Sequence, residues 1–147
     1  RMDHLLRPST EQGARKFLAE VALPALTALS QEFAARGIIS RVEQEDAEQC
    51  HLLVPQQGRR DFCYGMRIES HAAPAFNPLA AAHSGDAAAQ VCEVVTFFAD
   101  GRAGYDVQYL TQDEVSADVL RQYERYLNLI QSEQAELLNS APEHRPE

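Results

Sequence analysis

The fold is decided by the stretch Phe62-Cys63-Tyr64-Gly65-Met66-Arg67-Ile68-Glu69, in which large apolar side chains alternate with small or charged ones. Successive side chains of a strand point to opposite faces of a sheet, so this alternation predicts a half-buried strand. Strand-like runs also occur at residues 38–43, 50–54, 91–98 and 105–109. Because most of them are joined by short turns, the sequence predicts an antiparallel meander of about five strands.

The run Val91–Phe98 is largely apolar on both faces, which is typical of the central strand of a sheet. Before it, His71 to Asp86 is rich in alanine and contains two prolines, so a long loop is expected there. Loops of this length are either functional or disordered, and the sequence leaves both alternatives open.

A first helix is predicted from a capping box at Ser9–Gln12 to a C-cap glycine at Gly37. Its apolar residues recur at three- and four-residue spacing. They are Ala14, Phe17, Leu18, Val21, Ala25, Leu29 and Phe33. Pro24 lies inside this pattern and predicts either a kink or two shorter helices.

A second helix is predicted after the capping box Thr111–Glu114. Its apolar arc consists of Val115, Val119, Leu120, Tyr123, Tyr126, Leu127 and Ile130. We expect this helix to fray after Ser132. The predicted fold is therefore α+β, with an N-terminal and a C-terminal helix packed on one face of the antiparallel sheet.

The bulk composition restricts the classes of function. The 147 residues suit one domain, and the formal net charge of −9 argues against nucleic acid as a partner. The chain shows no signal peptide and no stretch of the roughly 18 to 20 apolar residues that a membrane span requires, so we expect it to be soluble. Its three widely spaced cysteines are expected to be free thiols.

Motifs for catalysis and for metal binding are missing from the sequence. Cys50 and His51 are adjacent, and on a strand they would point to opposite faces. No Gly-x-Ser-x-Gly motif occurs. Glu69, Glu93 and Asp106 could be proposed as catalytic carboxylates, but polar residues on the wet face of a sheet explain them more simply. We expect no enzyme, no cofactor and no metal site.

Four tyrosines lie at helix or strand spacing: Tyr105, Tyr109, Tyr123 and Tyr126. They could form an aromatic cage for a quaternary ammonium ion. The interpretation that we favour is core tyrosines with their hydroxyl groups at the rim.

The segment Gly104–Val115, followed by Asp118-Val119-Leu120-Arg121-Gln122-Tyr123-Glu124-Arg125-Tyr126-Leu127, resembles the cytoplasmic C-terminal tail of choline transporters in the betaine/carnitine/choline transporter family. Weaker matches upstream are Phe17-Leu18, Pro24-Ala25, Asp61–Gly65 and Pro74-Ala75-Phe76. The resemblance covers residues 14–130 in the same order. The alanine-rich segment 77–89 departs from the family pattern, which puts any ligand or lipid contact there in doubt.

The resemblance implies a cytoplasmic regulatory, osmosensing domain of a proton-driven choline transporter that supplies glycine betaine synthesis. Such a domain lies at the cytoplasmic side of the bacterial inner membrane. Residues 1–9 would then link it to the preceding transmembrane region, residues 10–132 would form the domain, and residues 133–147 a disordered tail.

We expect the regulatory contact surface to include Asp106, Gln122 and Arg125. The expected partners are the transmembrane part of the same transporter and, at high ionic strength, inner-leaflet lipid, because salt screens the repulsion of an acidic domain. Ion-paired solubility is the alternative role of these three residues. A stand-alone small-molecule-binding module and a homo-oligomerisation module, both without a membrane part, remain alternative functions.

Overall fold

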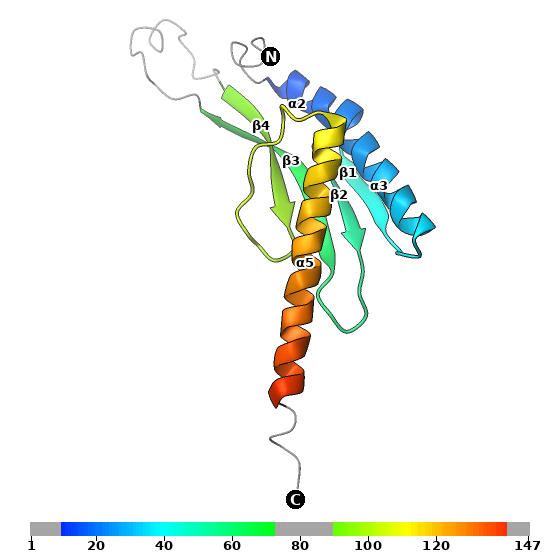
Figure 1. Ribbon diagram of the computed structural model, residues 1–147. Helices are drawn as coiled ribbons and strands as arrows, with labels where there is room; N and C mark the ends of the chain where they lie inside the picture. Colours follow the sequence, from blue (N-terminus) through cyan, green and yellow to red (C-terminus); the bar gives the residue numbers. More distant parts are fainter. Residues whose placement is uncertain (1–9, 73–89, 141–147) are drawn as a thin grey trace, which may run out of the picture.

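The computed structural model describes residues 10–72 and 90–140 (Figure 1). Its elements, in chain order, are α2 (Glu11–Phe17), the π-helix η1 (Leu18–Ala22), α3 (Leu23–Ala35), β1 (Arg41–Asp46), β2 (Gln49–Val54), β3 (Phe62–Ala72), β4 (Gln90–Phe98) and α5 (Gln112–Ser140). The expected linker 1–9, the match at Pro74-Ala75-Phe76 and the segment 77–89 lie outside the described residues. The expected loop also starts too early, because His71 and Ala72 still belong to β3.

The four strands form one antiparallel sheet in the order β1-β2-β3-β4, which confirms the α+β class. The expectation of about five strands is wrong, because Tyr105–Tyr109 contributes only a single bridge, Asp106 to Val95. Two backbone bonds tie this segment to β4, from Thr96 N to Tyr105 O at 3.0 Å and from Val107 N to Val94 O at 2.9 Å.

The segment turns away from the sheet because its own groups capture the next backbone donors. The carboxylate of Asp106 accepts from Gln108 N at 2.9 Å, and Leu110 N donates to Val107 O at 3.1 Å. These turn bonds compete with continued strand pairing.

The strand β4 lies at the end of the strand order, so the prediction that it is the central strand is also wrong. Its two faces differ. Cys92, Val94, Thr96 and Phe98 are buried, whereas Val91, Val95 and Phe97 are only half-buried. The segment after β4 covers the middle of its free edge through the two backbone bonds described above, which helps an apolar strand to occupy this position.

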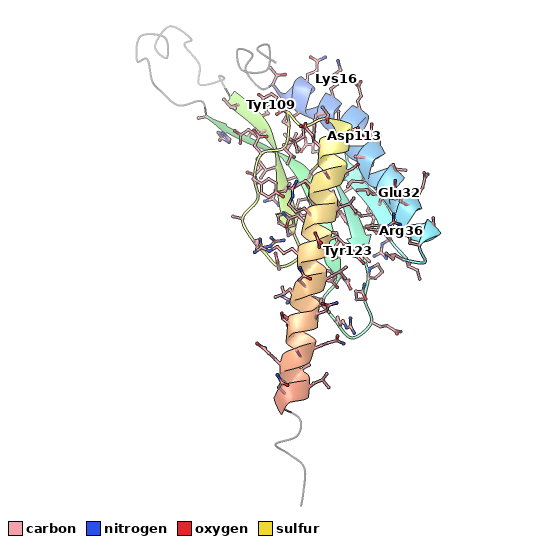
Figure 2. The ribbon with its side chains drawn as sticks, in the orientation of Figure 1. Lys16, Glu32, Arg36, Tyr109, Asp113 and Tyr123 are labelled. Atoms are coloured by element: carbon pink, nitrogen blue, oxygen red, sulfur yellow. The ribbon has the colours of Figure 1, made fainter. Side chains whose placement is uncertain are left out.

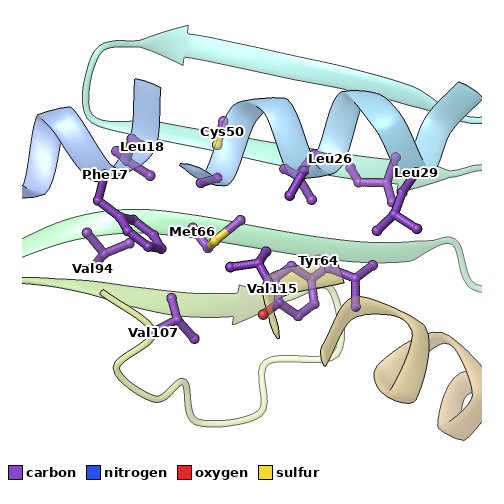
Figure 3. Packing of buried hydrophobic residues seen from close by; sticks show 14 of the residues in the cluster. Phe17, Leu18, Leu26, Leu29, Cys50, Tyr64, Met66, Val94, Val107 and Val115 are labelled. Atoms are coloured by element: carbon purple, nitrogen blue, oxygen red, sulfur yellow. The ribbon is translucent and has the colours of Figure 1, made fainter. Parts of the chain in front are cut away.

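All the described helices cover one face of the sheet, as predicted (Figure 1). The core lies between this face and the helices, and Figure 3 shows side chains from both layers meeting there. Leu26 and Leu29 of α3 enter it from the helical layer, and Tyr64, Met66 and Val94 enter it from the strands.

The first helical segment is continuous, with a π-helical turn immediately before Pro24. Leu23 N donates to Leu18 O, and Pro24 follows in the first turn of α3. Proline has no backbone N–H. The change from π-helical to α-helical hydrogen bonding therefore occurs next to Pro24, the residue that cannot donate a backbone hydrogen bond. The predicted capping box is displaced by one residue, because Thr10 is the N-cap and its Oγ1 accepts from Gly13 N at 3.0 Å. The predicted C-cap is confirmed, because Gly37 has a φ of 81°.

The capping box at the start of α5 is confirmed. Thr111 Oγ1 accepts from Glu114 N at 3.2 Å, and Glu114 Oε1 accepts from Thr111 N at 2.8 Å. The helix continues to Ser140, so its expected end at Ser132 is wrong, and residues 133–140 are helical. Figure 1 shows this C-terminal part of α5 extending past the strands.

Within residues 10–72 and 90–140, no helix combines the length and the apolarity needed to cross a membrane.

Candidate functional site: the polar interface between helix α5 and the sheet

A buried carboxylate, that of Asp118, joins α5 to the sheet. Asp118 is only 5% exposed. Its Oδ2 accepts hydrogen bonds from the Tyr64 and Tyr105 hydroxyl groups, each at 2.6 Å. Its Oδ1 accepts from Arg121 Nη1 at 2.7 Å. A buried charge is tolerated when it is paired and hydrogen-bonded. Tyr64 and Tyr105 thus fix the position of α5 on β3 and on the segment after β4, whereas Arg121 pairs with the carboxylate from α5 itself.

The two tyrosines keep their protons across the physiological range. Burial raises the pKa of Tyr64, and the hydrogen bond to Asp118 raises it further. Burial and the same carboxylate raise the pKa of Tyr105 to about 12. Both hydroxyl groups therefore remain hydrogen-bond donors to Asp118 at any pH at which the protein is expected to work.

Gln122 extends the network to the segment after β4. Its Nε2 donates to the Tyr105 hydroxyl at 3.1 Å, and its Oε1 accepts from Arg102 Nη1 at 3.1 Å. Arg102 also donates from Nε to Asp100 at 2.8 Å, and its guanidinium lies 4.3 Å from the centre of the Phe98 ring. Arg102 is thus oriented by an amide, a carboxylate and an aromatic face.

The pKa of Asp100 reflects this contact. Partial burial opposes ionisation of the carboxyl group, but hydrogen bonds and charge from Arg102 outweigh burial and lower the pKa. Asp100 therefore stays ionised and holds Arg102 in place at neutral pH.

Arg125 is exposed and lines a shallow cavity next to this network. Arg60 and Arg102 line the same cavity. Arg60 forms an ion pair with Glu133, and the carbonyl group of Arg60 accepts from the Tyr126 hydroxyl. The loop between β2 and β3 is thereby attached to the C-terminal half of α5.

The predicted surface residues fall into two groups. Gln122 contacts Arg102, which shares the cavity with Arg125. Asp106 lines a different hollow, together with Tyr105 and Arg121. The role of Asp106, Gln122 and Arg125 in a regulatory contact stays a prediction.

The structure does not bring the four tyrosines into one cage. Tyr123 and Tyr126 pack against Phe62, with ring centres 5.1 and 5.4 Å away, respectively. Tyr105 and Tyr126 line different hollows. Figure 2 shows Tyr109 next to the beginning of α5 and Tyr123 farther along that helix.

Sequence reasoning missed the Asp118 network. Asp118 and Arg121 belong to the motif that carries the resemblance, but no structural role follows for either from the sequence. The available signal was an acidic residue directly before Val119, within the apolar arc of a helix. Its partners come from residues 13 and 54 positions away in the chain, and no local pattern links them.

The three cysteines are free, and Cys50 and Cys92 are buried. Burial raises the pKa of the Cys50 and Cys63 thiols to about 11 in each case, which keeps them protonated and poorly nucleophilic. The part of the chain that the structure describes contains no group of three or more His, Cys, Asp or Glu residues able to hold a metal ion.

Comparison with known proteins connects the chain to transporters. It is 35% identical over 144 residues to an uncharacterized transporter of Haemophilus influenzae, an alignment that covers 93% of this chain and 21% of the relative. It is 27% identical over 136 residues to the high-affinity choline transport protein of Escherichia coli K12, covering 88% of this chain and 20% of that protein. The same protein of Escherichia coli O157:H7 gives equal values.

The chain is thus similar to one segment of bacterial transporters, and it spans about a fifth of the length of the curated relatives that it matches. One of these relatives is named for choline transport. No protein-family profile matches the chain. The relatives are transporters and not enzymes, which supports the prediction that this chain is a non-enzymatic, transporter-associated domain.

Proposed function

We propose that the chain is the cytoplasmic C-terminal regulatory domain of a proton-driven choline transporter of the betaine/carnitine/choline transporter family, which supplies glycine betaine synthesis at the bacterial inner membrane. The observation that carries this proposal is the alignment of nearly the whole chain with about a fifth of two transporters, one of which is named for choline. The partner of the domain is the transmembrane part of the same polypeptide.

The architecture suits a domain that transmits a contact. The hydrogen bonds from Tyr64 and Tyr105 to Asp118 join α5 to β3 and to the segment after β4. Gln122 is part of this network, and Arg125 lies exposed one turn farther along α5. A contact made at this surface would therefore be supported by a rigid core.

The formal net charge of −9 supplies a physical basis for an osmotic response. An acidic domain is repelled by an anionic membrane surface at low ionic strength. The Debye length falls from about 10 Å at 0.1 M salt to about 3 Å at 1 M, so rising internal salt weakens this repulsion and favours docking. If the domain associates equally well at all salt concentrations with vesicles or with the transporter core, this mechanism is wrong.

The proposal is tested by choline uptake in cells whose only choline transporter is the polypeptide that contains this chain. Deletion of residues 10–140 is expected to leave choline uptake measurable but to abolish its dependence on external osmolality. The surface variants Asp106→Asn, Gln122→Ala and Arg125→Gln should shift that dependence, whereas the matched control Arg36→Gln should not. An unchanged osmolality profile in the deletion variant would contradict the proposal.

A second candidate function is homo-oligomerisation through α5. Five leucines of this helix are exposed: Leu120, Leu127, Leu129, Leu137 and Leu138. Exposed apolar residues on a helix that extends past the sheet favour pairing with another helix. Light scattering across a concentration series tests this candidate. A monomer at every concentration refutes it, and so does a dimer that Leu137→Gln with Leu138→Gln leaves intact.

A further inference from the structure

The cavity beside α5 combines three arginines with an apolar floor. Arg60 comes from the loop between β2 and β3, Arg102 from the segment after β4, and Arg125 from α5. These segments are distant in sequence and meet only in the folded protein. The lining thus contains three of the 13 Lys and Arg residues of the chain, together with two carboxylates, Asp61 and Asp100.

The charges around the cavity are unequally balanced. Arg60 is paired with Glu133, and Arg102 with Asp100. Arg125 forms no hydrogen bond or ion pair with any residue that the structure describes. Asp61 also lines the cavity; its Oδ1 accepts a hydrogen bond from Gln56 N at 3.0 Å, and its negative charge remains part of the lining.

The floor of the cavity is apolar and ordered by packing. Phe62, Phe98, Tyr126 and Leu129 line it. Phe62 and Phe98 are only 3% and 8% exposed, so the accessible apolar surface of the cavity comes mainly from Leu129, which is 43% exposed, and from the half-buried Tyr126. Arg102 is held over the Phe98 ring and bonded to Gln122, so one guanidinium group is oriented before any ligand arrives.

We propose that this cavity binds a small organic anion in which one carboxylate or phosphate group is attached to an apolar body. The anionic group lies at Arg125 and Arg102, because the Arg125 guanidinium has no partner among the described residues and arginine pairs well with planar or tetrahedral oxyanions. The apolar body lies against Tyr126 and Leu129. This site goes beyond the proposed function and does not depend on a membrane part.

The test is a titration of the isotopically labelled chain, followed by amide chemical shifts at constant ionic strength. Phenyl phosphate and benzoate are the probes. Both are expected to produce saturable shifts centred on Phe62, Phe98 and Leu129. Inorganic phosphate lacks the apolar body and benzyl alcohol lacks the charge, so each is expected to bind at least about tenfold more weakly, the ratio that corresponds to 1.4 kcal/mol.

A matched pair of variants assigns the binding to Arg125. Arg125→Gln should weaken the binding of phenyl phosphate about tenfold, because it removes charge-assisted hydrogen bonds. Arg36→Gln makes the same charge change at the C-terminal end of α3 (Figure 2) and should leave the affinity unchanged. Both residues are exposed, and dispersed spectra verify that each variant is folded.

Three results would overturn the proposal. The first is the absence of saturable shifts with either organic anion. The second is equal weakening by Arg125→Gln and Arg36→Gln, which would show that only the overall charge matters. The third is equal affinity for inorganic phosphate and phenyl phosphate, which would remove the role of the apolar floor. The titration measures binding to the chain alone, so its outcome is independent of the transport assay.

Discussion

Removal of the Asp118 carboxylate should destabilise the protein strongly. Asp118→Ala deletes the shared acceptor of the Tyr64 and Tyr105 hydroxyl groups and the ion-pair partner of Arg121. Tyr64 is 0% exposed, so water cannot replace the lost acceptor without a rearrangement. A buried donor left without an acceptor costs about 1–3 kcal/mol, and hydrogen bonds to a charged group contribute about 1.5–3 kcal/mol. We therefore expect a loss of about 3 kcal/mol in the free energy of unfolding.

The assay is urea unfolding followed by far-ultraviolet circular dichroism. Glu124→Ala is the matched control, because Glu124 is an exposed carboxylate on the same helix and its loss should cost less than about 0.5 kcal/mol. Adding Tyr64→Phe to Asp118→Ala removes the orphaned hydroxyl group, so the double variant should recover about 1 kcal/mol.

Two results would refute this reasoning. The first is a cost of less than about 1 kcal/mol for Asp118→Ala, because a buried acceptor of three hydrogen bonds cannot then be present. The second is strict additivity of the two substitutions, which would mean that Asp118 and Tyr64 are energetically independent.

Three further predictions concern other parts of the fold. The pKa values of the Cys50 and Cys63 thiols are raised to about 11, so the folded state holds these protons more tightly than the unfolded state; the contribution of these thiols to stability should be constant below about pH 8.5 and fall between about pH 9 and 11, so Cys63→Ala should show a shallower fall over that range, as measured by urea unfolding in reductant. Thr111→Ala should cost about 1 kcal/mol in the same assay, since it removes the N-cap of α5; no change would mean that water caps the helix equally well. Gly104→Ala should lower the midpoint of thermal unfolding, because the added Cβ would lie 1.8 Å from the carbonyl oxygen of Thr96; an unchanged midpoint would show that the segment after β4 is not held against the strand.

The interface between α5 and the sheet links these predictions to the proposed function. Asp118 attaches α5 to the sheet through Tyr64. Gln122 of the same helix accepts a hydrogen bond from Arg102, which lines the cavity beside α5. A weakened Asp118 network should therefore loosen both the predicted contact surface and the anion site. Asp118→Asn keeps the shape of the side chain while removing its charge, so it can test this link in the transport assay with less damage to packing.

Several elements could be predicted from the sequence because their signals are local. The alternation in Phe62–Glu69 reports directly on the two faces of β3, and the capping box Thr111–Glu114 reports on the start of α5. The C-cap at Gly37 also depends on one residue, since only glycine adopts a positive φ there without strain. Residue types and spacing were sufficient at these positions because each signal lies within one or two turns of chain.

The remaining features were decided by contacts between distant residues. The apolar pattern of Val91–Phe98 is compatible with a central strand or with a covered edge, and only the bonds from Thr96 and Val94 to the following segment select the edge. The Asp118 network and the cavity beside α5 likewise could not be predicted from the sequence. Their side chains become neighbours only after α5 packs on the sheet, because the residues that contribute them are far apart in the sequence.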